Sequence, residues 1–89
     1  MAVASPAAAA GPSGCKSWRD SNDVRGYADC ASGPGYVRVI VKCTDYRGVT
    51  GTYRGSWVSA SSSAASVYSC GGQTAWVTGT SHETAISIG

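Results

Sequence analysis

Four cysteines in 89 residues constrain this chain more than any other feature. No two of them are separated by only two residues, which is the spacing that small zinc sites commonly use. The single histidine, His82, lies far from the last cysteine along the chain. Two disulfides therefore explain the cysteines better than a metal site does, and we expect neither a metal ion nor another cofactor. The cysteines are Cys15, Cys30, Cys43 and Cys70.

The chain is small enough that its hydrophobic core alone would be marginal, and two disulfides would compensate. Disulfides persist in oxidising surroundings, so we expect a secreted, extracellular protein. Four cysteines can pair in more than one way. We favour Cys15 with Cys30 and Cys43 with Cys70, because each half of the chain then forms a stapled hairpin, but the sequence leaves the other pairings open.

Residues 1–14 contain no charge and are rich in alanine. We expect them to form a flexible, extended arm ahead of a domain at 15–89, with Met1 replacing a removed signal peptide. Composition alone favours a tail without a specific role. The functional alternative is an arm that becomes ordered in a partner's groove. Its binding residues would be Ala2, Val3, Ala4, Ser5 and Pro6.

The segment 36–43 is the clearest strand, because its apolar and polar residues alternate. One face carries Val37, Val39, Val41 and Cys43, and the other carries Tyr36, Arg38, Ile40 and Lys42. The valine face should be buried. Its cysteine should therefore form a disulfide in or beside the core rather than remain a free thiol.

Other extended segments are short and are separated by Gly, Ser and Asp, and no segment has a helical pattern. This arrangement predicts an all-β fold, a small antiparallel β-sandwich stapled by two disulfides. We expect a loop or edge segment at 59–66 and further strands near 16–20, 27–30, 52–60, 67–70 and 74–78.

Charge and motifs argue against several functions. The seven basic residues form no run, so nucleic-acid binding is not expected, and no apolar stretch is long enough for membrane insertion. A serine hydrolase would need a nucleophile motif and a partner for His82, and the sequence indicates neither. The four aspartates lie in or near turns, where aspartate commonly accepts backbone hydrogen bonds. We therefore expect a protein that is not an enzyme.

Aromatic residues are the better candidates for function. The chain has three tryptophans, five tyrosines and no phenylalanine, a set suited to half-buried positions and contact surfaces. Tyr46, Tyr53 and Arg54 lie near the expected hairpin and are candidates for an exposed recognition patch. Ordinary strand faces carry the same residue types, so both interpretations stay open.

Several short motifs resemble those of small secreted actinobacterial proteins with two disulfides. They are Cys15-x-x-Trp18, Tyr27-Ala28-x-Cys30, Lys42-Cys43 and Gly55-x-Trp57-Val58, followed by Cys70. Within that group the chain is similar to the adaptor subunits of umbrella toxin particles, over roughly residues 15–77.

This resemblance implies a secreted adaptor with two protein partners. One partner would be a lectin-bearing subunit with a degenerate trypsin-like domain, whose cleft would accept the N-terminal arm. The other would be the repeat region of a large antibacterial polymorphic toxin, which would face the domain.

Two other functions compete with the adaptor. Two-disulfide β-sandwich inhibitors of α-amylase carry Trp-Arg-Tyr on a turn, and this chain has Trp18-Arg19 followed by Asp20 instead of tyrosine. Its third cysteine also comes earlier than in those inhibitors. A small secreted bacteriocin is the third possibility, but the low charge gives little attraction to anionic membranes.

Overall fold

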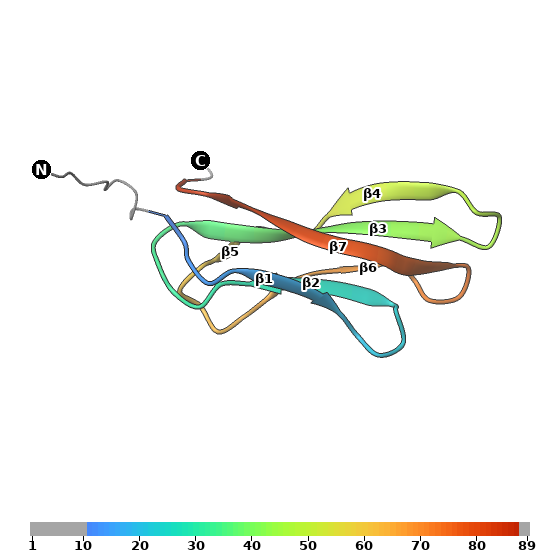
Figure 1. Cartoon of the computed structure of the whole chain (residues 1–89), viewed down its shortest axis with the longest axis horizontal. Helices are drawn as coiled ribbons and strands as arrows, with labels where there is room; N and C mark the ends of the chain where they lie inside the picture. Colours follow the sequence, from blue (N-terminus) through green and yellow to red (C-terminus); the bar gives the residue numbers. More distant parts are fainter. Residues whose placement is uncertain (1–10, 88–89) are drawn as a thin grey trace, which may run out of the picture.

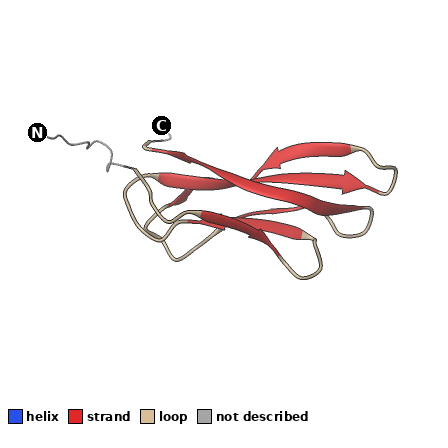
Figure 2. Ribbon diagram, in the orientation of Figure 1, coloured by secondary structure: helices blue, strands red, loops and turns tan. Residues whose placement is uncertain are grey.

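The computed structural model describes residues 11–87, so the predicted arm residues Ala2–Pro6 lie outside the described part. Residues 11–87 contain seven strands and no helix (Figures 1 and 2). A membrane-spanning helix is accordingly not found among them. The strands are β1 (Lys16–Arg19), β2 (Arg25–Asp29), β3 (Tyr36–Asp45), β4 (Thr50–Arg54), β5 (Val58–Ser59), β6 (Ser66–Ser69) and β7 (Ala75–Ala85). The all-β prediction is confirmed.

The strands form two antiparallel sheets that lie as two layers in Figure 1. The small sheet has the order β1-β2-β6. In the large sheet β3 is central, and β7 pairs with it along its whole length. β4 and β5 therefore follow one another along the opposite edge of β3. The β1–β2, β3–β4 and β6–β7 turns lie at one end of this sandwich.

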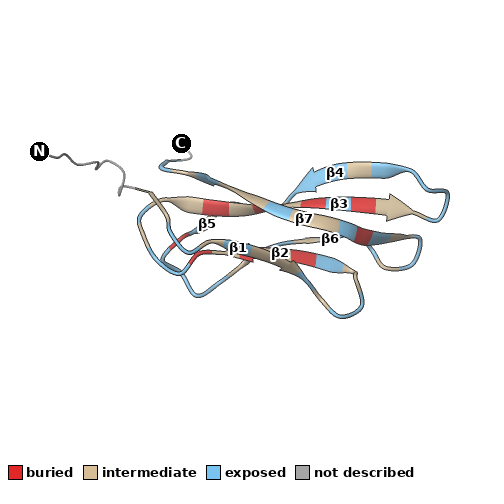
Figure 3. Cartoon of the chain, in the orientation of Figure 1, coloured by how far each residue is buried: buried red, intermediate tan, exposed pale blue. Residues whose placement is uncertain are grey.

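The core lies between the sheets and is centred on the valine face of β3. Val37, Val39 and Val41 are fully buried, as the alternation predicted, and β3 is marked by red segments in Figure 3. The other buried members of this core are Ala28, Cys30, Cys43, Ala60 and Val77. All of these side chains are small, so the sheets approach closely.

Gly26 of β2 allows that close approach. A Cβ atom there would lie 2.5 Å from Cγ2 of Val41 and 3.2 Å from Cγ2 of Thr80, so a larger residue would force the sheets apart. The sequence alone does not indicate this role, because the contact joins segments far apart in the chain.

The two disulfides have different structural roles. Cys15–Cys30 joins the start of β1 to the end of β2, and so it closes one end of the small sheet. Cys43–Cys70 joins β3 to the residue after β6, and so it connects the two sheets. The predicted pairing is confirmed, and the cysteine on the valine face does form a disulfide beside the core.

Two predicted strands have clearly different bounds in the structure. The strand predicted at 52–60 begins at Thr50 and is interrupted at 55–57, where the Gly55 N–H still donates to the Val39 carbonyl. The strand predicted at 74–78 continues to Ala85, so His82 lies within β7. Residues 79–85 lack an alternation of large apolar residues, and it is the pairing along β3 that extends the strand through them.

The end of the predicted arm is attached to the domain. The Ser13 N–H donates to the Ser32 carbonyl at 2.9 Å, and the two residues form an antiparallel bridge. Gly11 lies beside Ile86, since a Cβ atom on it would be 3.7 Å from that side chain. Residues 11–14 therefore pack on the sandwich. That the residues before them form a separate arm stays a prediction.

Candidate protein-binding surface

The outer face of the large sheet carries a group of charged and aromatic side chains. Cross-strand partners in an antiparallel sheet point to the same face. Arg38 is the partner of Glu83, and Ile40 is the partner of Arg54. Val37, Val39 and Val41 point inward, so Arg38 and Ile40, which alternate with them, point outward. Their cross-strand partners Glu83 and Arg54 point outward as well.

Four of these outer residues form a connected unit, which we call the arginine cluster: Arg38, Arg54, Trp57 and Glu83. Oε2 of Glu83 accepts a hydrogen bond from Nε of Arg38 and lies 3.4 Å from Nε of Arg54. The Arg38 guanidinium lies over the Trp57 ring, 4.4 Å from its centroid. The cluster is partly exposed, and its single carboxylate is shared by two cations.

A small hollow lies on this face beside the cluster. It has a volume of about 180 Å³ and is lined by Ile40, Lys42, Gly79, Thr80 and Ser81. The register of β7 on β3 shifts between Lys42 and Cys43, and Gly79 adds no side chain opposite Lys42. Drug-sized ligands need roughly 300 Å³ or more. The hollow therefore suits one side chain of a partner rather than a free ligand.

The outer face of the small sheet is arranged differently. The Trp18 and Tyr27 rings are stacked with centroids 5.5 Å apart, and Nζ of Lys16 lies 5.0 Å from the centroid of Trp18. Nζ of Lys16 also lies 3.0 Å from Oδ1 of Asp29. The Trp18 ring and the charge of Lys16 thus both have partners within the small sheet.

The predicted patch of Tyr46, Tyr53 and Arg54 is not one surface. Tyr46 lies on the β3–β4 turn and is 73% exposed. Tyr53 stacks on Tyr68 of the other sheet, with ring centroids 5.2 Å apart. Arg54 follows Tyr53 directly and so points to the opposite face. The three residues are exposed, but the structure does not bring them together, and a binding role for each stays a prediction.

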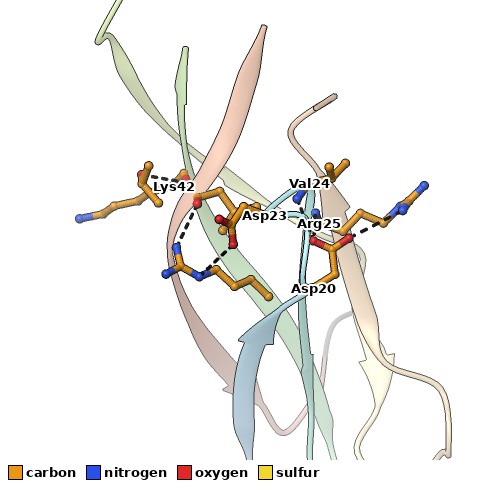
Figure 4. Close-up of polar contacts among 8 residues, drawn as sticks. Asp20, Asp23, Val24, Arg25 and Lys42 are labelled. Atoms are coloured by element: carbon orange, nitrogen blue, oxygen red, sulfur yellow. Dashed lines mark hydrogen bonds and ion pairs between the residues drawn. The ribbon is translucent and has the colours of Figure 1, made fainter. Parts of the chain in front are cut away.

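The turn aspartates have the structural role that the sequence suggested. Oδ1 of Asp20 accepts from the Val24 N–H at 2.8 Å and from the Arg25 N–H at 3.4 Å (Figure 4). The hydrogen bond from Val24 is the main reason why the pKa of Asp20 is lowered. At the β3–β4 turn, the hydrogen bond from the Arg47 side chain lowers the pKa of Asp45.

Asp23 and Arg19 connect the β1–β2 turn to the large sheet. Asp23 has a φ of 57°, and its carbonyl accepts from the Val77 N–H at 2.7 Å. Nη1 of Arg19 donates to the Val77 carbonyl at 3.1 Å, and its Nε lies 3.3 Å from Oδ1 of Asp23. Trp18 and Arg19 therefore lie in β1 and not on a turn, and Arg19 is held by the protein itself.

His82 is only partly exposed, and its Nδ1 atom is buried without a hydrogen-bond partner among residues 11–87. The same residues contain no group of three His, Cys, Asp or Glu side chains that could hold a metal ion. Among the described residues, the side chains suited to contact with a partner are the charged and aromatic ones of the arginine cluster.

Comparison of the chain with protein-family models, with curated proteins and with solved structures finds no match. The inferences below therefore depend on the residues themselves and on the motif resemblance.

The sequence interpretation missed Arg38, Lys42, Trp57 and Glu83 as members of a functional surface. The alternation in 36–43 already placed Arg38 and Lys42 on one exposed face, which was the available signal. Glu83 had no such signal, because it joins Arg38 only through the full-length pairing of β7 with β3.

Proposed function

We propose that this protein is an extracellular, non-enzymatic adaptor that binds two protein partners. The N-terminal arm binds one partner, and the outer face of the large sheet binds the other. Following the resemblance, the first partner is the trypsin-like, lectin-bearing subunit of a toxin particle. The second is the repeat region of the large antibacterial toxin.

The arginine cluster is the observation that carries this proposal. Arginine and aromatic residues supply much of the binding energy at protein interfaces. Here Arg38 is held between Glu83 and Trp57, so it loses little further conformational freedom when a partner binds. The face belongs to a sheet fastened by a disulfide, which keeps the surface rigid.

Two further observations support the proposal. Both disulfides are consistent with an extracellular protein. The small side chains of Ala2, Ala4 and Ser5 would let a partner's groove approach the main chain of the arm closely. No feature of β1 favours the amylase-inhibitor alternative, since the Arg19 side chain is engaged with Val77 and Asp23.

The proposal is tested by deleting residues 2–10. This deletion spares Ser13 and its bridge to Ser32, so the thermal unfolding midpoint should change little. Capture of one partner from the culture medium of the producing organism, identified by mass spectrometry, should be lost while capture of the other is retained. The matched control is Arg38→Ala with Trp57→Ala, which should have the opposite pattern.

Unchanged capture of both partners after the deletion would reject the arm as a binding element. Growth arrest of bacteria by the isolated chain would favour the bacteriocin alternative, because an adaptor alone should be harmless. Inhibition of α-amylase by the isolated chain, lost on Trp18→Ala, would favour the inhibitor.

A further inference from the structure

The net charge of the chain is unevenly distributed. Seven basic and five acidic residues give a formal charge of +2, and all twelve lie within residues 11–87. Four basic side chains each have a carboxylate of their own within 4.0 Å, so these regions are neutral. The pairs are Lys16–Asp29, Arg19–Asp23, Arg25–Asp20 and Arg47–Asp45.

The remaining three basic side chains all lie on the outer face of the large sheet. Arg38 and Arg54 share Glu83, the only acidic residue left. Lys42 has no carboxylate within 4.0 Å among the described residues, and it is exposed. Three positive charges and one negative charge leave +2, which is the formal charge of the whole chain.

Lys42 also lines the hollow and points away from the turn between β1 and β2. Figure 4 shows its side chain extending away from Asp20 and Asp23. Opposite it, Gly79 leaves space, and Ser81 offers a hydroxyl group at the rim of the hollow. A carboxylate-bearing side chain that entered here would meet an unpaired ammonium group and a hydrogen-bond donor.

We propose that the outer face of the large sheet binds an acidic segment of a protein partner. One carboxylate pairs with Lys42 at the hollow, and a second pairs with Arg54, which is about half exposed and only shares Glu83. This inference deepens the proposed function, because it names the chemistry of the partner that the domain face binds.

A peptide fits this face better than a nucleic acid does. Phosphate backbones are bound by rows of cations, whereas here a carboxylate lies between two of the three cations. The small hollow suits a single side chain.

The experiment is a titration of the full chain with a short fluorescent Glu-rich peptide at low salt, followed by fluorescence polarisation and by amide NMR shifts. The same peptide with every Glu replaced by Gln and a single-stranded DNA oligonucleotide serve as comparison probes. We expect the Glu-rich peptide to bind most tightly. Shifts should be confined to β3, β4 and β7.

Variants locate the binding energy. Lys42→Gln and Arg54→Gln should each weaken peptide binding by roughly fivefold, the upper end for an exposed ion pair. Lys16→Gln is the matched control, because it removes the same charge from the small sheet. It should leave the peptide affinity unchanged. Gly79→Ala should weaken binding by partly filling the hollow.

Three outcomes would overturn the inference. One is an equal loss for Lys16→Gln and Lys42→Gln, which would mean general charge attraction. Another is tighter binding of the oligonucleotide at the same face. The third is the absence of peptide binding at the large sheet, seen either as no binding of the Glu-rich peptide or as amide NMR shifts in other parts of the chain. If protein partners are still captured in that case, the adaptor function stands and only the acidic chemistry is wrong.

Discussion

The outer faces of the two sheets follow the same rule of cross-strand pairing and reach different results. On the small sheet, Lys16 forms an ion pair with Asp29 that no other basic side chain shares, and Trp18 stacks on Tyr27. On the large sheet, Arg38 and Arg54 compete for Glu83. On the small sheet each charge has a partner of opposite sign, whereas on the large sheet positive charges outnumber negative ones and remain available to another protein. A modest net charge is thus informative once its location is known.

The largest losses of stability should come from removing the disulfides. Replacing Cys43 and Cys70 by alanine removes the bridge between the sheets, whose cysteines are 27 residues apart. Chain entropy gives a loss of about 3.5 kcal/mol in the free energy of unfolding. Replacing Cys15 and Cys30, which are 15 residues apart, should cost about 3 kcal/mol.

Denaturant unfolding of both double variants measures these losses. Each variant also loses one buried cysteine side chain, Cys43 in the first and Cys30 in the second, so a packing loss adds to both. A greater loss for the Cys15–Cys30 variant would contradict the view that the bridge between the sheets matters more.

Two glycines provide the next comparison. Gly26→Ala should destabilise by about 1–3 kcal/mol, because the added Cβ would overlap Val41. Gly79→Ala places its Cβ atom 3.8 Å from the Lys42 side chain, an ordinary contact, and should be close to neutral. Thermal unfolding of both variants tests this. Equal effects would show that the sheets can separate without cost.

The ion pairs should have smaller effects. Glu83→Gln leaves Arg38 and Arg54 without a carboxylate and should cost up to about 1 kcal/mol. Asp29→Asn affects one exposed lysine and should cost only a few tenths, about 0.2–0.5 kcal/mol. Glu83→Gln should also tighten binding of the Glu-rich peptide. Weaker peptide binding by this variant would mean that Glu83 mainly positions Arg38.

The smallest effect is the pH dependence of the turns. The pKa values of Asp20 and Asp45 lie below the ordinary 3.8 in the folded state. Their ionised forms therefore stabilise the fold above that value, and the contribution is lost as the pH falls through the lowered folded pKa values. Asp20→Asn keeps an acceptor for Val24 but removes the charge.

Unfolding free energies measured from about pH 5 down to about pH 2 should therefore fall less steeply for Asp20→Asn than for the unmodified chain. The thermal midpoint at neutral pH serves as the control for turn geometry. An unchanged pH slope would assign the acid sensitivity to other groups.

Much of the fold was predictable from local pattern. The alternation at 36–43 identified the buried face, because the two-residue period of a strand is independent of its neighbours. Aspartates in turns were correctly interpreted for the same reason, since Asp20 and Asp45 bond to backbone within five residues. The full length of β7 was missed because residues 79–85 show no apolar alternation, and only their pairing with β3 reveals the strand.

The candidate surface was only half predictable. Tyr53 and Arg54 were grouped because they are neighbours in sequence, yet neighbours in a strand point to opposite faces. Tyr53 stacks on Tyr68, while Arg54 shares Glu83 with Arg38. The contact of Glu83 with the two arginines joins β3, β4 and β7, and no spacing in the sequence predicts it.

The sequence by itself determined the strand-forming segments, the buried face of β3 and the need for two disulfides, because these follow from the period and chemistry of nearby residues. Only the tertiary structure decided which charges neutralise one another and which face keeps the surplus. The physical reason is that charge pairing depends on distance in space, and strand register brings together residues that lie far apart in the chain.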